Sequence, residues 1–272
     1  MVGNSLSHFG ATYSYRRRYY HETLALPSSV KALEVLVDHF LPLTKERQYE
    51  IASLRDRFVL LPHSLEASLG SSDGLQLQYI KNIHNVLKLM CPPFWSDHVA
   101  FTRIGRRKVG HLAPVPRSNE SLGVLTKNIL EVQQYIDYQI ILENISCPFA
   151  FGNPEMSEVD FLTQICESTH VELLLDLSNL LSSQTSPETI IRTLDPKYVR
   201  ALHLGGGDFY RGTYLDLHDR PVSDTVWNLL SSAFERFTPS AVIIEWDICL
   251  PPFEDLYREI QRAQVAYTSV LA

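Results

Sequence analysis

Short apolar runs rich in Ile, Leu and Val recur along the chain, and most are followed by a longer segment of helical pattern. Most of these runs are apolar at successive rather than alternate positions, which is typical of parallel strands covered on both faces. The eight runs are residues 8–13, 32–40, 58–64, 95–101, 139–145, 171–177, 199–205 and 241–247, and the first is the weakest. Repeated strand–helix units predict a closed or doubly wound parallel sheet.

The segments between the runs support the same architecture. Apolar residues recur at helical spacing over residues 74–90 and 119–138, Ser157 and Ser223 are placed to cap the helices that follow them, and a last helix is expected from residue 253 to about residue 270. About eight strand–helix units fit a chain of 272 residues. We therefore expect an α/β fold, a single (β/α)8 TIM-type barrel that forms one domain over residues 1–272.

Charge and cysteine content exclude several classes of protein. The formal net charge is -7, and an acidic chain is a poor non-specific binder of nucleic acid or of anionic membranes. No apolar run approaches the roughly 18 residues that a membrane span needs, and the N-terminus has no signal-peptide pattern. The widely spaced cysteines are Cys91, Cys147, Cys166 and Cys249, which indicate neither a disulfide framework nor a zinc knuckle. We expect a cytoplasmic protein with no membrane partner and no nucleic-acid partner.

Polar side chains stand where the apolar runs end. Burying a carboxylate costs several kcal/mol unless it is paired or bound to a metal, and the strand ends of a barrel converge on one face. The candidate metal ligands are His63, His98, Glu143, Asp176, Asn179, His203, Asp216, His218 and Glu245. Nitrogen and oxygen ligands without thiolate favour iron, zinc or manganese, and their number predicts two or three ions with a bridging carboxylate. Asp97 and Asp247 are predicted to orient neighbouring ligands.

Each of these residues also has an ordinary structural explanation. A histidine at a strand end is more often hydrogen-bonded in the core or at the surface, and an aspartate there more often caps the next helix. Six successive strands would each need such an explanation, which favours the metal site.

Two further segments invite a functional interpretation. Residues 13–20 combine aromatic residues with Arg16, Arg17 and Arg18, which predicts either a surface that grips an acidic peptide or a phosphate backbone, or a solvated rim of the barrel. Gly205, Gly206 and Gly207 follow His203 without a nucleotide fingerprint, and we interpret them as a flexible loop that carries Asp216 and His218 into the site.

Several motifs occur in the order and at the spacing of a known family. They are LPHSLEASLGS at 61–71, SDHVAF at 96–101, LENIS at 142–146, LLLDLSNL at 173–180, HLGG at 203–206, DLHDRPV at 216–222 and IEWDICLPP at 244–252. From about residue 32 onward the chain resembles the multinuclear non-haem iron-dependent oxidative enzymes, the family typified by the methanobactin biosynthesis enzyme MbnB, which are similar in fold to xylose-isomerase-like barrels.

The resemblance implies oxygen-dependent oxidation of residues, above all cysteines, in a ribosomally made precursor peptide by two or three Fe(II)/Fe(III) ions. It implies that His63, His98 and Glu143 hold one iron, and that Glu143 bridges to a second iron held by Asp176, His203 and Glu245. A third ion would be held by Asn179, Asp216 and His218. Glu143, His203 and Asp216 are the expected catalytic residues. The implied partners are the precursor peptide and a small peptide-recognition protein.

Two other functions stay open at this point. One is a metal-dependent hydrolase or isomerase of the abasic-site endonuclease or sugar isomerase type, against which the net charge of -7 argues. The other is a barrel that has lost its chemistry and only binds a peptide, against which the complete ligand set argues.

Overall fold

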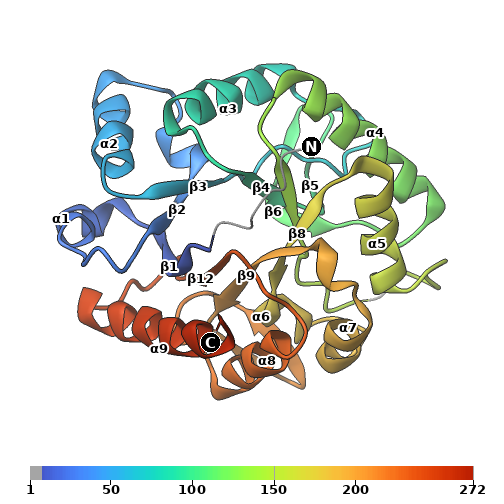
Figure 1. Ribbon diagram of the computed structural model, residues 1–272. Helices are drawn as coiled ribbons and strands as arrows, with labels where there is room; N and C mark the ends of the chain where they lie inside the picture. The colour runs from blue at the N-terminus through green and yellow to red at the C-terminus, as the bar shows by residue number, and fades with distance from the viewer. Residues whose placement is uncertain (1–7, 150, 272) are drawn as a thin grey trace.

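The strands of the chain close into a barrel. A computed structural model describes residues 8–149 and 151–271, and in this part of the chain eight parallel strands form the closed order β1-β12-β9-β8-β7-β4-β3-β2 (Figure 1). The barrel strands are β1 (Gly10–Tyr15), β2 (Ala32–Leu36), β3 (Val59–His63), β4 (Trp95–His98), β7 (Ile140–Glu143), β8 (Glu172–Asp176), β9 (Val199–Gly205) and β12 (Ala241–Glu245). The predicted (β/α)8 barrel is confirmed. The predicted single domain of residues 1–272 includes positions outside the description and stays a prediction.

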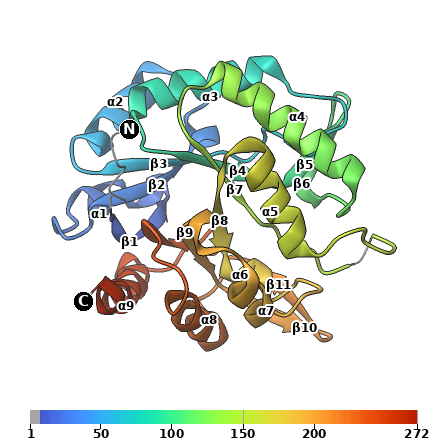
Figure 2. The ribbon, with the colours of Figure 1, turned by 45° about the vertical axis from the view of Figure 1, so that its right-hand side comes forward.

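Helices cover the outside of the barrel (Figures 1 and 2). They are α1 (Tyr20–Leu24), α2 (Lys45–Arg55), α3 (Leu77–Met90), α4 (Asn119–Tyr135), α5 (Glu158–Thr169), α6 (Leu177–Leu180), α7 (Pro187–Thr193), α8 (Asp224–Phe234) and α9 (Phe253–Leu271). The predicted caps are confirmed, since the Ser157 and Ser223 hydroxyls accept hydrogen bonds from the first turns of α5 and α8. None of the described helices is long and apolar enough to cross a bilayer.

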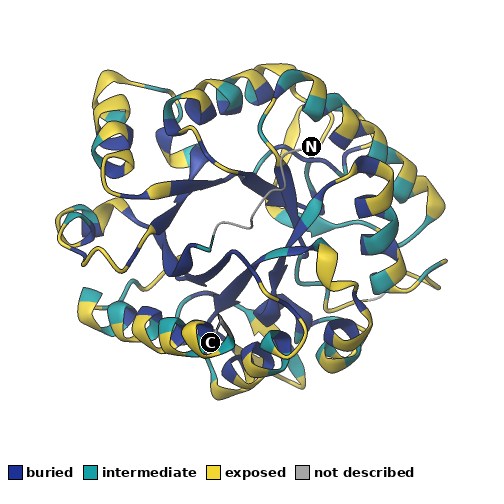
Figure 3. Ribbon diagram, viewed as in Figure 1, coloured by how far each residue is buried: buried dark blue, intermediate teal, exposed yellow. Residues whose placement is uncertain are grey.

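The inside of the barrel is built in layers, because alternate residues of a strand point to opposite faces. The strands are buried at nearly every position, as the dark interior of Figure 3 shows. A small apolar cluster contains Ala32, Leu61, Ile141, Leu174, Ala201 and Ile243. The residues two positions further along these six strands are Glu34, His63, Glu143, Asp176, His203 and Glu245. One apolar layer therefore supports one polar layer at the carboxyl ends of the strands.

Two antiparallel hairpins, which the sequence analysis did not predict, extend from this face. The predicted run 95–101 divides at Val99 into β4 and β5 (Ala100–Ile104), and β5 pairs with β6 (Arg107–Pro114). β10 (Gly207–Tyr210) pairs with β11 (Thr213–Asp216), so a hairpin stands where a flexible loop was predicted after His203, and it brings Asp216 and His218 to the side of Glu245. The physical reason is close packing: a Cβ on Gly206 would lie 1.8 Å from the carbonyl oxygen of Arg220.

Several predicted strand boundaries also move, and two of them serve as examples. β1 begins at Gly10 rather than at residue 8, and β2 ends at Leu36 because residues Val37–Phe40 form a 3-10 turn.

Candidate metal centre

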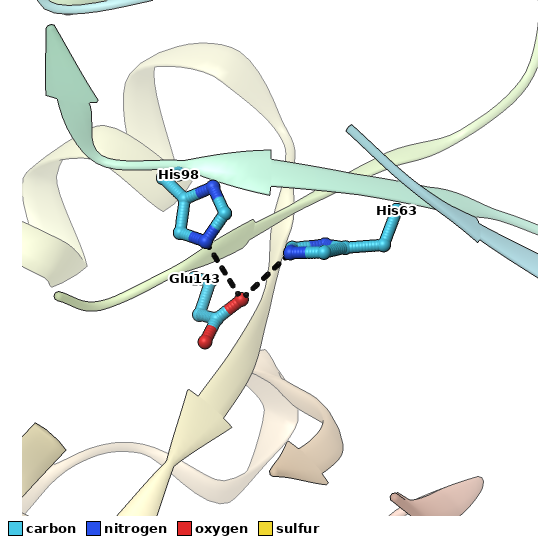
Figure 4. A group of neighbouring side chains, drawn as sticks. All are labelled: His63, His98 and Glu143. Carbon is cyan, nitrogen blue, oxygen red and sulfur yellow. Dashed lines mark ion pairs between the residues drawn. The ribbon is translucent and has the colours of Figure 1, made fainter. Parts of the chain in front are cut away.

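Two histidines and a glutamate form a first ligand group at the ends of β3, β4 and β7 (Figure 4). The Nε2 atoms of His63 and His98 lie 3.4 Å and 3.3 Å from the same carboxylate oxygen, Oε2 of Glu143. All three side chains are buried, and Nδ1 of His63 lies 2.8 Å from the Ser96 hydroxyl, which holds the ring in this orientation. The three ligand atoms therefore converge on one point.

A second group shares Glu143 with the first. It consists of Glu143, Asp176, His203 and Glu245, from β7, β8, β9 and β12. Nδ1 of His203 lies 3.2 Å from Oε1 of Glu143, 3.1 Å from Oε2 of Glu245 and 4.0 Å from Oδ2 of Asp176. Glu143 thus turns one carboxylate oxygen to each group, which is the arrangement of a bridging ligand.

A third group lies at the open side of the centre and differs in part from the prediction. It consists of His218, Glu245 and Asp247, with Nδ1 of His218 3.5 Å from Glu245 and 3.3 Å from Asp247. Asp216 approaches the other nitrogen of the same ring, Nε2, at 2.8 Å. Asp247, predicted only to orient a neighbour, is therefore placed among the candidate ligands.

Asn179 is held beside the second group by hydrogen bonds to Asp176 and Asn144. Its backbone N–H donates to Oδ1 of Asp176 at 2.7 Å, and its side-chain amide donates to the Asn144 carbonyl at 3.0 Å. Its predicted role as a ligand of a third ion stays a prediction. The Asp97 carboxylate accepts a hydrogen bond from the His98 backbone N–H at 2.7 Å and none from the His98 ring, so its predicted orienting role stays a prediction.

The polar atoms of the site fit a bound cation. Buried polar atoms are nearly always hydrogen-bonded, because an unpaired one costs about 1–3 kcal/mol. Here the buried atoms without a hydrogen-bond partner include His63 Nε2, Glu143 Oε2 and Asp176 Oδ2. Metal ions would satisfy all of them, and the set contains nitrogen and oxygen atoms only, as iron, zinc or manganese sites do.

The electrostatics of the site favour cations as well. Burial raises the pKa of Glu143, but His203 and His98 outweigh this effect and hold the pKa well below its usual range. Burial also opposes the charge on His203, yet Glu34, Glu143 and Glu245 raise its pKa well above the usual value. Burial, Asp216 and Glu143 raise the pKa of Asp176 to about 7. Ionised carboxylates this close together repel each other, so the cluster needs positive charge among them to be stable.

One residue of the centre was missed by the sequence analysis. Glu34 of β2 is 1% exposed, and its Oε2 lies 2.7 Å from Nε2 of His203, on the side of the ring opposite the second group. A signal was available, because Glu34 is a charged residue inside the apolar strand 32–36, two positions after Ala32 of the apolar layer. A carboxylate at this position orients the imidazole and leaves Nδ1 free to bind a metal.

Residues 13–20 do not form the continuous gripping surface that was one of their two predicted roles, since only Arg17 and Arg18 of this segment are exposed. Tyr13 and Tyr15 are buried in the core, and Arg16 is buried with its guanidinium on Asp247 and Ser14. Arg17 pairs with Glu46 and Glu50 of α2. β1 is buried on both faces, and Arg16, which follows it directly, is buried as well, so the three arginines do not form one exposed patch.

The chain is similar to known proteins over most of its length. The family model described as RiPP precursor modification enzyme MbnB/TglH/ChrH matches residues 10–268. A UPF0276 protein of Caulobacter vibrioides is 31% identical over 244 residues, covering 88% of this chain and 87% of that protein. A UPF0276 protein of Rhizorhabdus wittichii is 31% identical over 270 residues, covering 97% and 96%.

Solved structures show the same fold at low identity. Endonuclease IV from Thermus thermophilus matches with a TM-score of 0.60 and 13% identity over 96% of this chain and 99% of that one. A xylose isomerase domain protein from Planctomyces limnophilus matches with a TM-score of 0.59 and 14% identity over 98% and 99%. At such identities the likeness concerns the barrel alone.

Proposed function

Because the chain belongs to the MbnB/TglH/ChrH family of RiPP precursor modification enzymes, we propose that it oxidises a cysteine of a ribosomally made precursor peptide, using oxygen and two or three iron ions. The family supports peptide modification in general. The metal, the oxidant and the target residue are parts of the proposal.

The observation that carries the proposal is the sharing of ligands. Glu143 belongs to the first and second groups, and Glu245 belongs to the second and third. Three adjoining groups joined by carboxylates are the arrangement that a multinuclear centre requires, whereas a zinc or magnesium hydrolase with a single ion needs only one such group. His63 and His98 would hold one ion, Asp176 and His203 a second, and His218 with Asp216 or Asp247 a third. Iron bound there would supply the electrons with which oxygen is reduced.

The chain's own residues close the site on one side and open it on the other. The side chains of Glu143 and His203 are 2% and 0% exposed, whereas those of Asp216 and Asp247 are 11% and 45% exposed. The apolar layer below the ligands, which includes Ile141 and Ala201, excludes water from the barrel side. The ligands on the side of Asp216 and Asp247 are therefore the ones most open to solvent.

The test is metal analysis and turnover of protein purified without oxygen. We expect more than one iron and little zinc per chain, and an oxygen-dependent mass change in a cysteine-containing peptide. Glu143→Gln should lose both iron and turnover, because it removes the shared ligand. Glu50→Gln is a matched control, since Glu50 is also buried but accepts its hydrogen bond from Tyr15, away from the centre.

A zinc-only protein that keeps its activity after iron removal would refute the proposal. That result would favour the alternative of a metal-dependent hydrolase or isomerase.

A further inference from the structure

The β5–β6 hairpin extends from the ligand-bearing face and is largely uncovered by the rest of the described chain. All of β6 from Arg107 to His111 is exposed, and its last three residues are half-buried. Ile104 and Val109 expose 65% and 43% of their surface. A two-stranded hairpin exposed in this way is marginally stable by itself and gains from a third strand.

Only one edge of this hairpin is covered. On the β5 side, the Gly70 N–H donates to the Ala100 carbonyl at 2.8 Å, and the Thr102 N–H donates to the Ser68 hydroxyl at 2.9 Å. Among the described residues, the backbone of β6 has no hydrogen bonds except those to β5. The outer edge of β6 therefore carries backbone donors and acceptors available to an added strand, with a break where residues 109–112 bulge opposite Thr102.

The hairpin is also strongly cationic in an acidic protein. Residues 99–119 contain no Asp or Glu, and their five cations are Arg103, Arg106, Arg107, Lys108 and Arg117. Arg103 is buried on the Gly74 and Gly105 carbonyls, and Lys108 pairs with Glu66. Arg106 and Arg107 at the tip are exposed and have no ion pair within the described part of the chain. The charge left at the tip complements a carboxylate-bearing ligand.

The hairpin leads directly to the metal centre. β5 is separated from His98 by Val99 alone, and the base of β6 at Pro114 borders a cavity of about 50 Å³. Asn144, the residue after Glu143, lines the same cavity. β6 runs alongside the five residues of β5, which span roughly 17 Å, so a strand on the edge of β6 would run from the cationic tip toward the neighbourhood of the ligands.

Given the proposed function, we infer that the free edge of β6 binds an extended, acidic segment of the precursor peptide as a third strand. The backbone edge supplies affinity without demanding one sequence, and Arg106 and Arg107 select acidic side chains at the tip. Nucleic acid would satisfy the arginines but offers no strand to the free edge. This role replaces the one predicted for Arg16, Arg17 and Arg18.

The test uses two fluorescein-labelled peptides, (Glu-Thr)6 and (Lys-Thr)6, and fluorescence anisotropy with the full chain at low ionic strength. We expect the glutamate peptide to bind about tenfold more tightly than the lysine peptide, and salt to weaken this binding. In hydrogen exchange followed by mass spectrometry, the amides of residues 107–114 should exchange more slowly when the glutamate peptide is bound.

Charge reversal tests the tip. Arg106→Glu with Arg107→Glu should weaken the glutamate peptide about tenfold and leave the iron content unchanged. Arg258→Glu with Arg262→Glu is the matched control, because it changes the net charge equally on exposed positions of α9, on the opposite side of the barrel from β6 (Figure 1).

Three results would overturn the inference: equal affinity for the two peptides or no binding of either, binding without slower exchange at 107–114, or tighter binding of a twelve-thymidine oligonucleotide. The inference and the proposed function can fail separately. Iron-free protein that protects β6 on binding the glutamate peptide would refute the function alone, whereas an iron-loaded, peptide-oxidising protein without that protection would refute the inference alone.

Discussion

Replacing Glu34 by Gln should weaken metal binding at the second ligand group. The carboxylate of Glu34 and the ring of His203 are 1% and 0% exposed at the side chain, and their contact of 2.7 Å is a charge-assisted hydrogen bond. When Nδ1 of His203 binds a metal, Nε2 keeps its hydrogen and Glu34 accepts it. The glutamine keeps an acceptor of the same shape and removes the negative charge.

The size of the effect follows from what the substitution leaves in place. A hydrogen bond to a charged group contributes about 1.5–3 kcal/mol, and the amide oxygen retains part of it. We expect a loss of about 1.4 kcal/mol, which is about tenfold in metal affinity and lies within the range known for partners of metal-bound histidines. Glu34→Ala should cost roughly a hundredfold, because Nε2 is then buried without any partner.

The assay is an anaerobic Fe(II) titration against a competing chelator, with iron counted per chain. Glu50→Gln should bind iron like the unaltered protein, because it makes the same chemical change at a buried site outside the ligand groups. An iron affinity of Glu34→Gln within about twofold of the Glu50→Gln value would show that Glu34 does not support His203, and the reasoning above would be refuted.

Three other predictions concern metal removal, a glycine and a titrating helix residue. Removing iron with a chelator should lower Tm by about 5–10 °C, since metal at a hundred times its Kd stabilises the fold by about 2.7 kcal/mol; an unchanged Tm would argue against a preformed centre. Gly205→Ala should reduce the metal bound at the third group, because its Cβ would lie 2.3 Å from Nε2 of His218. The control Gly123→Ala in α4 meets nothing within 4 Å and should stabilise the folded protein by about 0.5–1 kcal/mol. Full metal content in Gly205→Ala would contradict this prediction. Burial raises the pKa of Glu259 to about 7, so the folded state favours the protonated carboxyl group and is destabilised as the pH rises through about 7. Glu259→Gln should therefore have the Tm of the unaltered protein near pH 4 and a higher Tm at pH 8. A Tm difference that does not depend on pH would contradict this prediction.

Much of the centre follows from local sequence alone. Apolar runs predict the barrel strands, and two-residue alternation determines which side chains share a face, so His63, Glu143, Asp176, His203 and Glu245 could be placed together without coordinates. The same alternation also points to Glu34, a charged residue inside an apolar strand, although the sequence analysis did not single it out. These features are visible in the sequence because strand periodicity is a property of neighbouring residues.

Other features depend on contacts between distant segments. Glu34 and His203 are 169 positions apart, and only closure of the barrel brings the carboxylate to the ring. Three other features depend on how loops pack against each other: the position of Asp247 beside His218, the burial of Arg16, and the two hairpins. Gly205 and Gly206 show this packing, because a Cβ on either residue would collide with His218 or Arg220. Loop conformation is set by these long-range contacts, which carry no periodic signal in the sequence, so only the tertiary structure decides it.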